Sequence, residues 1–266
     1  VLLIKGRHEF THRWLMYMKE IKFEHQIIIA DGQDDDETKK MIDEINGENI
    51  LSIRYYRYNT HAGYPEYFKM KNDILSKVET ELVMLCDNDD FILPMGLNKQ
   101  IIFLSENLEY ISSSGRILNF ELDNYNNSCF GKKINLLHPY QYHRLEEPGG
   151  SWKKYIDSIY TKFQPNFYNV FYVNHLKQIS HELVELNVSD FIISEFYIQL
   201  RTASIGKSKI IGSTFHYLRQ RGTSTISNNY EFTQELLKRN MPNDFRKMIT
   251  KFAEILNKKN YKEDVK

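Results

Sequence analysis

Short apolar runs alternate with amphipathic segments through residues 1–107, and no other feature constrains the fold as strongly. The apolar runs are typical of strands buried on both faces, and they lie at 1–4, 26–30 and 81–85. Residues 50–58 alternate like a further strand. Between the strands, apolar residues at helical spacing predict helices over 10–21, 34–46 and 67–78. Strands and helices in alternation predict an α/β fold with a mostly parallel central sheet flanked by helices.

The second half of the sequence is less regular. Its patterns predict helices over 96–105, 152–163, 173–186, 195–204 and 231–257, and strands over 110–122 and 209–217. Glycine-rich or polar stretches predict loops over 123–131, 145–150 and 222–229. The chain has 266 residues, which is enough for one large domain or for a domain with an added lobe.

Charge and cysteine content exclude several classes of protein. The 35 basic and 35 acidic residues balance, whereas a dedicated nucleic-acid binder needs an excess of Lys and Arg. Cys86 and Cys129 are too few for a disulfide framework and favour a reducing compartment, so we expect a cytoplasmic protein. No stretch approaches the roughly 20 apolar residues of a membrane span, and the run at 1–4 is too short for a signal peptide. The chain begins without Met inside an expected strand, which fits part of a longer polypeptide.

Three carboxylates lie within four residues at Asp87, Asn88, Asp89 and Asp90, directly after the apolar run 81–85. Carboxylates this close repel one another unless a cation lies among them, and their oxygens suit Mg²⁺ or Mn²⁺. A cation on Asp87 and Asp89, with Asp90 in reserve, could neutralise a departing diphosphate. The alternative is a solvated acidic turn that caps the next helix. Ligands bind beyond the carboxyl ends of parallel strands, so the position favours the metal site.

Two positions in the first half have two open interpretations each. Asp31 ends the second apolar run, where it could accept a hydrogen bond from a base or a ribose hydroxyl, or form a common Asp-Gly turn with Gly32. Lys71 lies in the predicted helix 67–78 and is by default an exposed helix residue, although a lysine beside a diphosphate is also sensible.

The late segment holds further charged candidates. Arg219 and Arg221 precede Gly222 and could clamp phosphates from a mobile lid, or lie in a charged loop. Glu195 opens a predicted helix. A carboxylate there is usually a cap or a partner of the helix dipole, whereas a general base must reach an acceptor hydroxyl, and the sequence alone leaves both roles open.

Motifs of other enzyme classes are missing from the sequence. It has no Walker-type loop, no G-x-G-x-x-G after the first strand and no G-x-S-x-G elbow. Its 9 histidines show neither H-E-x-x-H nor zinc-ligand spacing.

The ordered set of these residues resembles the family 2-type glycosyltransferases of the GT-A fold over roughly residues 1–227. The matching elements are the strand and turn Leu2–Arg7, the turn Ala30-Asp31-Gly32-Gln33, the stretch 59–63, the pair Lys71-Asn72, the D-x-D motif Asp87-Asn88-Asp89, and Ser194-Glu195 before the helix 196–201. Five departures occur. One acid of the second-strand turn is missing, the stretch 59–63 is lengthened, and Lys71 stands in place of Arg. Glu195 takes the place of the catalytic aspartate, and Ser194 replaces its neighbour.

This resemblance implies a GT-A (Rossmann-like) fold with a less regular C-terminal acceptor half. Residues 1–107 would bind the nucleotide-sugar, 108–230 would bind the acceptor and carry catalysis, and 231–266 would form a helical extension. The implied reaction is inverting hexosyl or related glycosyl transfer from a nucleotide-sugar, with a UDP-sugar favoured, to a glycan or lipid-linked glycan. Such an enzyme would be cytoplasmic, with the inner face of the membrane as a compatible location.

The resemblance also distributes roles. Glu195 becomes the general base, and Mn²⁺ or Mg²⁺ is held by Asp87 and Asp89, with His216 near the metal or phosphates. The residues expected to contact the donor are Lys5, Arg7, Asp31, Lys71, Asp87, Asn88, Arg219 and Arg221.

Two rival functions remain at the sequence level. A sugar nucleotidyltransferase shares a related sheet, but it usually has a glycine-rich basic loop after the first strand, where this chain has His8, Glu9 and Phe10. A non-catalytic module that binds glycans or nucleotides inside a larger protein stays open, because the base position is altered.

Overall fold

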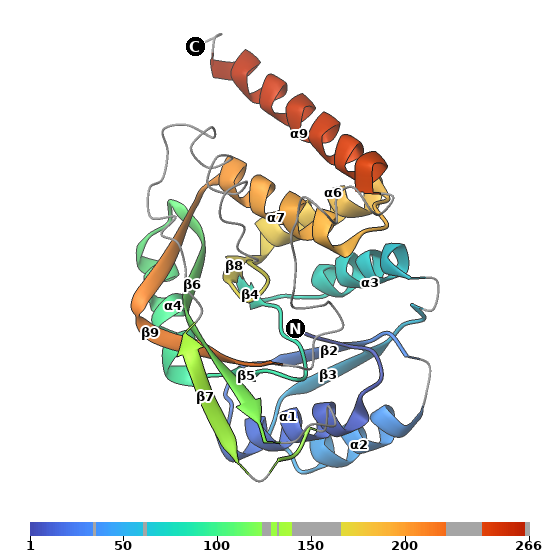
Figure 1. The fold of residues 1–266 in the computed structure, drawn as a ribbon, viewed down its shortest axis with the longest axis vertical. Helices are drawn as coiled ribbons and strands as arrows, with labels where there is room; N and C mark the ends of the chain where they lie inside the picture. Colours follow the sequence, from blue (N-terminus) through green and yellow to red (C-terminus); the bar gives the residue numbers. More distant parts are fainter. Residues whose placement is uncertain are drawn as a thin grey trace.

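The computed structural model describes residues 1–33, 36–60, 63–123, 129–131, 133–139, 166–221 and 241–263. Its first layer is a parallel sheet of β1 (Leu2–Ile4), β2 (Ile27–Asp31) and β3 (Ile53–Arg57), in the order β1-β2-β3. α1 (His8–Glu20) and α2 (Asp36–Gly47) lie on one side of this sheet, and α3 (Tyr64–Ser76) lies on the other (Figure 1).

The core explains why β2 reads as a continuous apolar run. Ile27 and Ile29 pack in the cluster that contains residues of α1 and α2, whereas Ile28 and Ala30 pack in the cluster that contains residues of α3. All four side chains are at least 97% buried. Because successive side chains of a strand point to opposite faces, a strand covered on both faces needs apolar residues throughout.

The second sheet is mixed and contains the remaining described strands. It runs in the order β4-β8-β6-β9-β5, with β7 paired to β6, and only the pair β6·β9 is parallel. The strands are β4 (Leu82–Met84), β5 (Phe91–Ile92), β6 (Tyr110–Leu122), β7 (Ile134–Pro139), β8 (Val170–Tyr172) and β9 (Lys207–Gln220).

Cys86 joins the two sheets. β4 itself pairs antiparallel with β8, so its predicted place in the parallel sheet is wrong. Two residues beyond β4, however, Cys86 pairs in parallel with Leu2 of β1. The Leu3 N–H donates to the Cys86 carbonyl at 3.1 Å, and the Cys86 N–H donates to the Val1 carbonyl at 2.9 Å. The residues after Cys86 therefore emerge beside the carboxyl end of β1, as the sequence predicts for the acidic segment.

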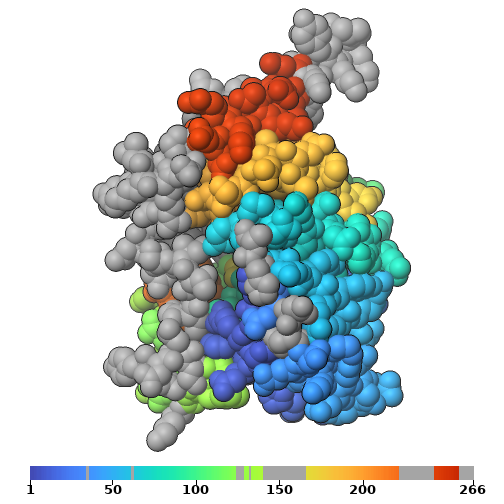
Figure 2. All heavy atoms as spheres, turned by 90° about the vertical axis from the view of Figure 1, so that its right-hand side faces the viewer, coloured from blue at the N-terminus to red at the C-terminus, as the bar shows by residue number. Residues whose placement is uncertain are grey.

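Within the described residues, four further helices cover the second sheet and one end of the molecule. They are α4 (Pro94–Glu106), α6 (Val173–Leu186), α7 (Phe191–Ile205) and α9 (Met241–Glu263). α9, the region of α6, and α3 are stacked above the first three strands and their helices (Figure 2). Side chains of α6, α7 and α9 share one apolar cluster with Phe68 of α3. No described helix has the length and apolarity needed to cross a bilayer.

The predicted α/β fold class is confirmed, and the long strand 110–122 and the helix 173–186 have their predicted bounds. Other boundaries are corrected: α3 begins at Tyr64, three residues early, and α7 begins at Phe191 rather than at Glu195. The short strands β5, β7 and β8 were not predicted. The predictions for 145–150, 152–163 and 222–229 lie outside the described residues, as do those on 34–35, 61–62 and 231–240.

Candidate functional site

The acidic segment forms one cluster next to the carboxyl end of β1. One carboxylate oxygen from each of Asp87, Asp89 and Asp90 lies within 4.8 Å of the other two. Asp89 and Asp90 are only 8% and 2% exposed, and Asp87 is partly buried. Such crowding is unfavourable for ionised side chains unless positive charge is close.

Arg7 supplies part of that positive charge. Its Nη1 and Nη2 both lie 3.2 Å from Oδ2 of Asp89. Arg7 has a φ of 60° at the start of α1, and its guanidinium lies 4.1 Å from the centre of the Phe10 ring. The turn after β1 thus positions a cation against the acidic cluster, as expected for a residue at this edge of the sheet.

Asn88 does not point toward the cluster. Its Nδ2 donates to Thr11 Oγ1 at 2.9 Å and approaches the Arg7 carbonyl at 3.4 Å. The side chain is only 5% exposed. Asn88 therefore attaches the acidic segment to α1, and its contact with a donor stays a prediction.

The pKa values of Asp87 and Asp90 are raised, first by burial and then by the negative charge of neighbouring carboxylates. Burial, followed by the charge of Asp89, raises the pKa of Asp87 to about 7. Burial, followed by the charges of Asp89 and Asp87, raises the pKa of Asp90 well above its usual range. A divalent cation would relieve this repulsion, and three carboxylates form the hard-oxygen donor set that Mg²⁺ and Mn²⁺ prefer, so the residues fit a metal site.

Glu195 lies one turn into α7 and is electrostatically coupled to the acidic cluster. Burial raises its pKa to about 7, the positive charges of Arg219 and Lys71 act to lower that pKa, and the charge of Asp87 acts to raise it. The cap of α7 is Asp190, which accepts hydrogen bonds from the N–H groups of Ile192 and Ile193 at 2.9 and 3.3 Å. The prediction that Glu195 opens the helix is wrong, because Asp190 performs that task.

Lys71 is the buried cation of this region. It is only 2% exposed, so the default interpretation as a surface lysine is wrong. Its Nζ lies 5.5 Å from the centre of the Phe68 ring, and within the described residues it donates no hydrogen bond. Burial lowers the pKa of Lys71 to about 8, and the charge of Glu195 acts against that shift. Lys71 of α3 and Glu195 of α7 are therefore electrostatically coupled.

Arg219 and Arg221 differ in position. Arg219 lies on β9, paired with Asn119 of β6, and its charge acts to lower the pKa of both Asp87 and Glu195. It thus belongs to a paired strand rather than to a loop. Arg221 lies just beyond β9, where its N–H donates to the Phe120 carbonyl at 2.9 Å. The expected lid after it lies outside the described residues.

Asp31 and Lys5 are committed to contacts within the protein. Asp31 is fully buried, and its two oxygens accept from the Gln33 N–H at 2.9 Å and from the Tyr55 hydroxyl at 2.8 Å. The exposed Lys5 donates to the Thr60 carbonyl at 2.8 Å. The turn-forming role of Asp31 is present, and its contact with a nucleotide stays a prediction.

His216 does not have a ring nitrogen available for a metal. Its Nδ1 accepts from the Gly115 N–H at 3.1 Å, and its Nε2 lies 3.2 Å from the Tyr168 carbonyl. The side chain is fully buried, and burial lowers its pKa to about 4. The predicted metal role of His216 is therefore wrong, because both ring nitrogens bind backbone groups.

Tyr168 and Arg13 contribute to the site but were not predicted. The Tyr168 hydroxyl donates to Asp90 Oδ2 at 2.9 Å and reaches Asp87 Oδ2 at 3.3 Å. Arg13 on α1 donates from Nη2 to the Asp89 carbonyl at 2.9 Å and from Nη1 to Gln220 Oε1 at 2.8 Å. Neither residue belongs to a local motif, so no sequence signal distinguishes them from other Tyr and Arg residues.

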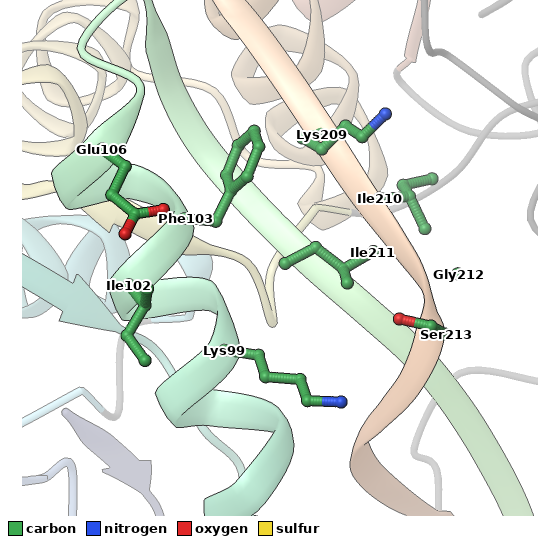
Figure 3. A pocket seen from close by; sticks show the side chains of 9 residues that line it. All are labelled: Lys99, Ile102, Phe103, Glu106, Lys209, Ile210, Ile211, Gly212 and Ser213. Atoms are coloured by element: carbon green, nitrogen blue, oxygen red, sulfur yellow. The ribbon is translucent and has the colours of Figure 1, made fainter.

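A groove elsewhere on the surface has no comparable chemistry. It lies between α4 and β9, with Ile102 and Phe103 on one side and Ile210 and Ile211 on the other (Figure 3). None of the acidic cluster lines it. The acidic cluster with Glu195, Lys71 and Arg219 is therefore the candidate site.

Comparison with known proteins identifies the fold. No model of a protein family matches the sequence, and no curated protein matches it either. Among solved structures, TarS of S. aureus matches with a TM-score of 0.54 at 14% identity, over 82% of this chain and 36% of that chain. TarS 1-349 in complex with UDP matches with a TM-score of 0.54 at 12% identity, over 82% and 60%. The complex of TarS 1-349 with UDP-GlcNAc has the same TM-score at 11% identity, over 83% and 58%.

These similarities show the fold alone. The arrangement of sheets and helices in this chain is GT-A-like. The aligned region spans from about a third to three fifths of the TarS chains.

Proposed function

We propose that this chain is a metal-dependent glycosyltransferase, which moves a sugar from a UDP-sugar to a hydroxyl group of a glycan. The observation that carries the proposal is the cluster of three carboxylates that follows Cys86 beside β1, together with the electrostatic coupling of Asp87 to Glu195 and Arg219 and of Glu195 to Lys71. Such a site combines a place for a cation with a base and two positive charges. The GT-A-like fold, found in TarS complexes with UDP and UDP-GlcNAc, supports a UDP-sugar as the donor.

Asp87 and Asp89 would hold Mn²⁺ or Mg²⁺ together with the donor diphosphate. When bound, the cation supplies neutralisation of the charge that develops on the departing diphosphate. Arg219 would add positive charge at the same place, and Lys71 would face the sugar side of the site through its proximity to Glu195. We also propose that the donor contacts Lys5, Asp31 and Arg221. For these contacts to form, the donor must displace the present partners of the three residues or draw their side chains toward itself.

Glu195 would act as the general base for an inverting, single displacement. It would take the proton of the acceptor hydroxyl while that oxygen attacks the anomeric carbon from the face opposite the nucleotide. A pKa of about 7 suits this task, because the ideal base is poised near the working pH. Residue 195 lies on a helix buried on most of its surface, which holds the carboxylate in a defined place.

We extend the proposal to the organisation of the chain and its surroundings. Residues 1–107 would bind the donor, 108–230 would bind the acceptor, and 231–266 would extend the domain. These roles fit a family 2-type hexosyl transfer to a glycan or lipid-linked glycan. The reaction would take place in the cytoplasm or at the inner face of the membrane.

A screen of nucleotide-sugars for thermal stabilisation tests the donor directly. We expect one UDP-sugar, with MnCl₂ present, to raise the melting temperature more than the other nucleotide-sugars, because a bound ligand stabilises the folded state by mass action. Stabilisation by every nucleotide alike, or by none with either cation, would contradict the proposal.

The Glu195→Gln variant tests the catalytic part. It should keep the donor-induced stabilisation and lose glycosyl transfer, measured as UDP release in the presence of acceptor glycans. Transfer at the rate of the wild-type protein would remove Glu195 from the role of base, and loss of donor binding would give it a different role. A non-catalytic module would bind the donor in both variants without UDP release.

A further inference from the structure

We propose that Tyr168 is a positioning residue, whose hydroxyl divides the acidic cluster into a structural carboxylate, Asp90, and two cation ligands, Asp87 and Asp89. The inference rests on the proposed function, because it assigns roles within the same cation site. It also gives His216 a role, namely to hold the backbone of Tyr168 in place.

Both carboxylate oxygens of Asp90 accept hydrogen bonds from the protein. Its Oδ1 accepts from the Gln220 N–H of β9 at 2.7 Å, and its Oδ2 accepts from the Tyr168 hydroxyl at 2.9 Å. The side chain is only 2% exposed. Both oxygens thus tie the acidic segment to neighbouring elements, and a cation bound to Asp90 would have to break one of these hydrogen bonds.

Asp87 keeps one oxygen for a ligand. The Tyr168 hydroxyl lies 3.3 Å from its Oδ2, and within the described residues no group donates to its Oδ1. One contact on one oxygen sets the rotation of a carboxylate while leaving the other oxygen available. Hydrogen-bonding partners of this kind orient metal ligands and tune metal affinity.

Tyr168 can act as a fixed reference because its own backbone is held. Gly115 N–H donates to Nδ1 of His216, so the ring proton lies on Nε2, which donates to the Tyr168 carbonyl at 3.2 Å. A side chain at Gly115 would meet this histidine, since an added Cβ would lie 3.0 Å from Nδ1. The Tyr168 ring also packs on the Tyr217 ring, with centroids 4.1 Å apart. The chain of contacts therefore runs from β6 through β9 to the acidic cluster.

The Tyr168→Phe variant tests the proposal, and Tyr217→Phe is its matched control. Both changes remove one buried phenolic hydroxyl from the same ring pair, but no described residue forms a hydrogen bond with the Tyr217 hydroxyl. Binding of MnCl₂ in the presence of UDP is measured by electron paramagnetic resonance, with unfolding midpoints recorded on the same samples. We expect Tyr168→Phe to weaken Mn²⁺ binding about tenfold or more and to change the spectrum of the bound ion. Tyr217→Phe should match the wild-type protein in both.

Asp90→Asn supplies a second test that does not depend on Tyr168→Phe folding. The amide oxygen can still accept the Gln220 N–H, so Mn²⁺ affinity should stay near that of the wild-type protein, whereas Asp89→Asn should lose most of it. Equal affinity in Tyr168→Phe and the wild-type protein, or loss of binding in Asp90→Asn as large as in Asp89→Asn, would overturn the positioning role alone. A wild-type protein that binds no Mn²⁺ with UDP would overturn metal dependence and this inference with it.

Discussion

Replacing Glu195 by Gln should make the protein more stable above pH 7. In the folded protein, burial raises the pKa of Glu195 from 4.5 to about 7, even though Arg219 and Lys71 attract the carboxylate. The folded state therefore binds the Glu195 proton more tightly than the unfolded chain does. Stability contributed by this group is fully present below pH 4.5 and is lost as the pH rises toward 7.

The size of the effect follows from that pKa. A change from 4.5 to about 7 corresponds to roughly 3 kcal/mol of unfavourable free energy for the ionised carboxylate in the fold. Glu195 keeps some contact with solvent, so we expect about 2 kcal/mol after allowance for screening. The variant should gain this stability at pH 8 and almost none at pH 4.5.

Urea denaturation at pH 8 and at pH 4.5 measures the difference. Glu182→Gln is the matched control, because Glu182 is also buried but accepts hydrogen bonds from Arg201 at 2.6 and 2.8 Å and from Tyr197 at 2.8 Å. Breaking this buried pair should destabilise the protein by about 3 kcal/mol or more, the opposite sign. A Glu195→Gln variant that is no more stable than the wild-type protein at pH 8, or that gains equally at both pH values, would refute the reasoning.

Two other predictions concern the same group of residues. Glycosyl transfer should increase about tenfold between pH 6 and pH 8, because Glu195 with a pKa of about 7 must lose its proton to act as a base, and a flat pH–rate profile would speak against this role. Lys71→Met should move that increase to higher pH, because the charge of Lys71 lowers the pKa of Glu195; an unmoved or lowered profile, with an intact fold confirmed by urea denaturation, would exclude the coupling.

The sequence predicts the first half of the fold well, for a physical reason. A strand covered on both faces must be apolar at every position, so Ile27, Ile28, Ile29 and Ala30 stand out without any knowledge of their neighbours. β5 has only two residues, and its pairing partners lie on β9 far along the chain. Such a strand is stabilised by tertiary contacts and leaves no periodic pattern to detect.

The same difference between local patterns and tertiary contacts separates the site residues that the sequence predicts from those that it does not. Asp87 and Asp89 could be placed from the sequence because the chain position after an apolar run determines the edge of the sheet on which they emerge. Tyr168 could not, because its contact with Asp90 spans 78 residues and depends on how β8 pairs with β6. His216 was assigned to a metal for want of the same information, since only the fold places the Gly115 N–H and the Tyr168 carbonyl at its two nitrogens.

The most direct measurement of the central claim is calorimetric titration of UDP into the wild-type protein with MnCl₂, into the same protein with a chelator, and into Asp89→Ala with MnCl₂. If the acidic cluster holds a cation that bridges to a diphosphate, UDP should bind in the first titration and at least about tenfold more weakly in the other two. Equal affinity for UDP in all three titrations, or no binding in any of them, would contradict the account.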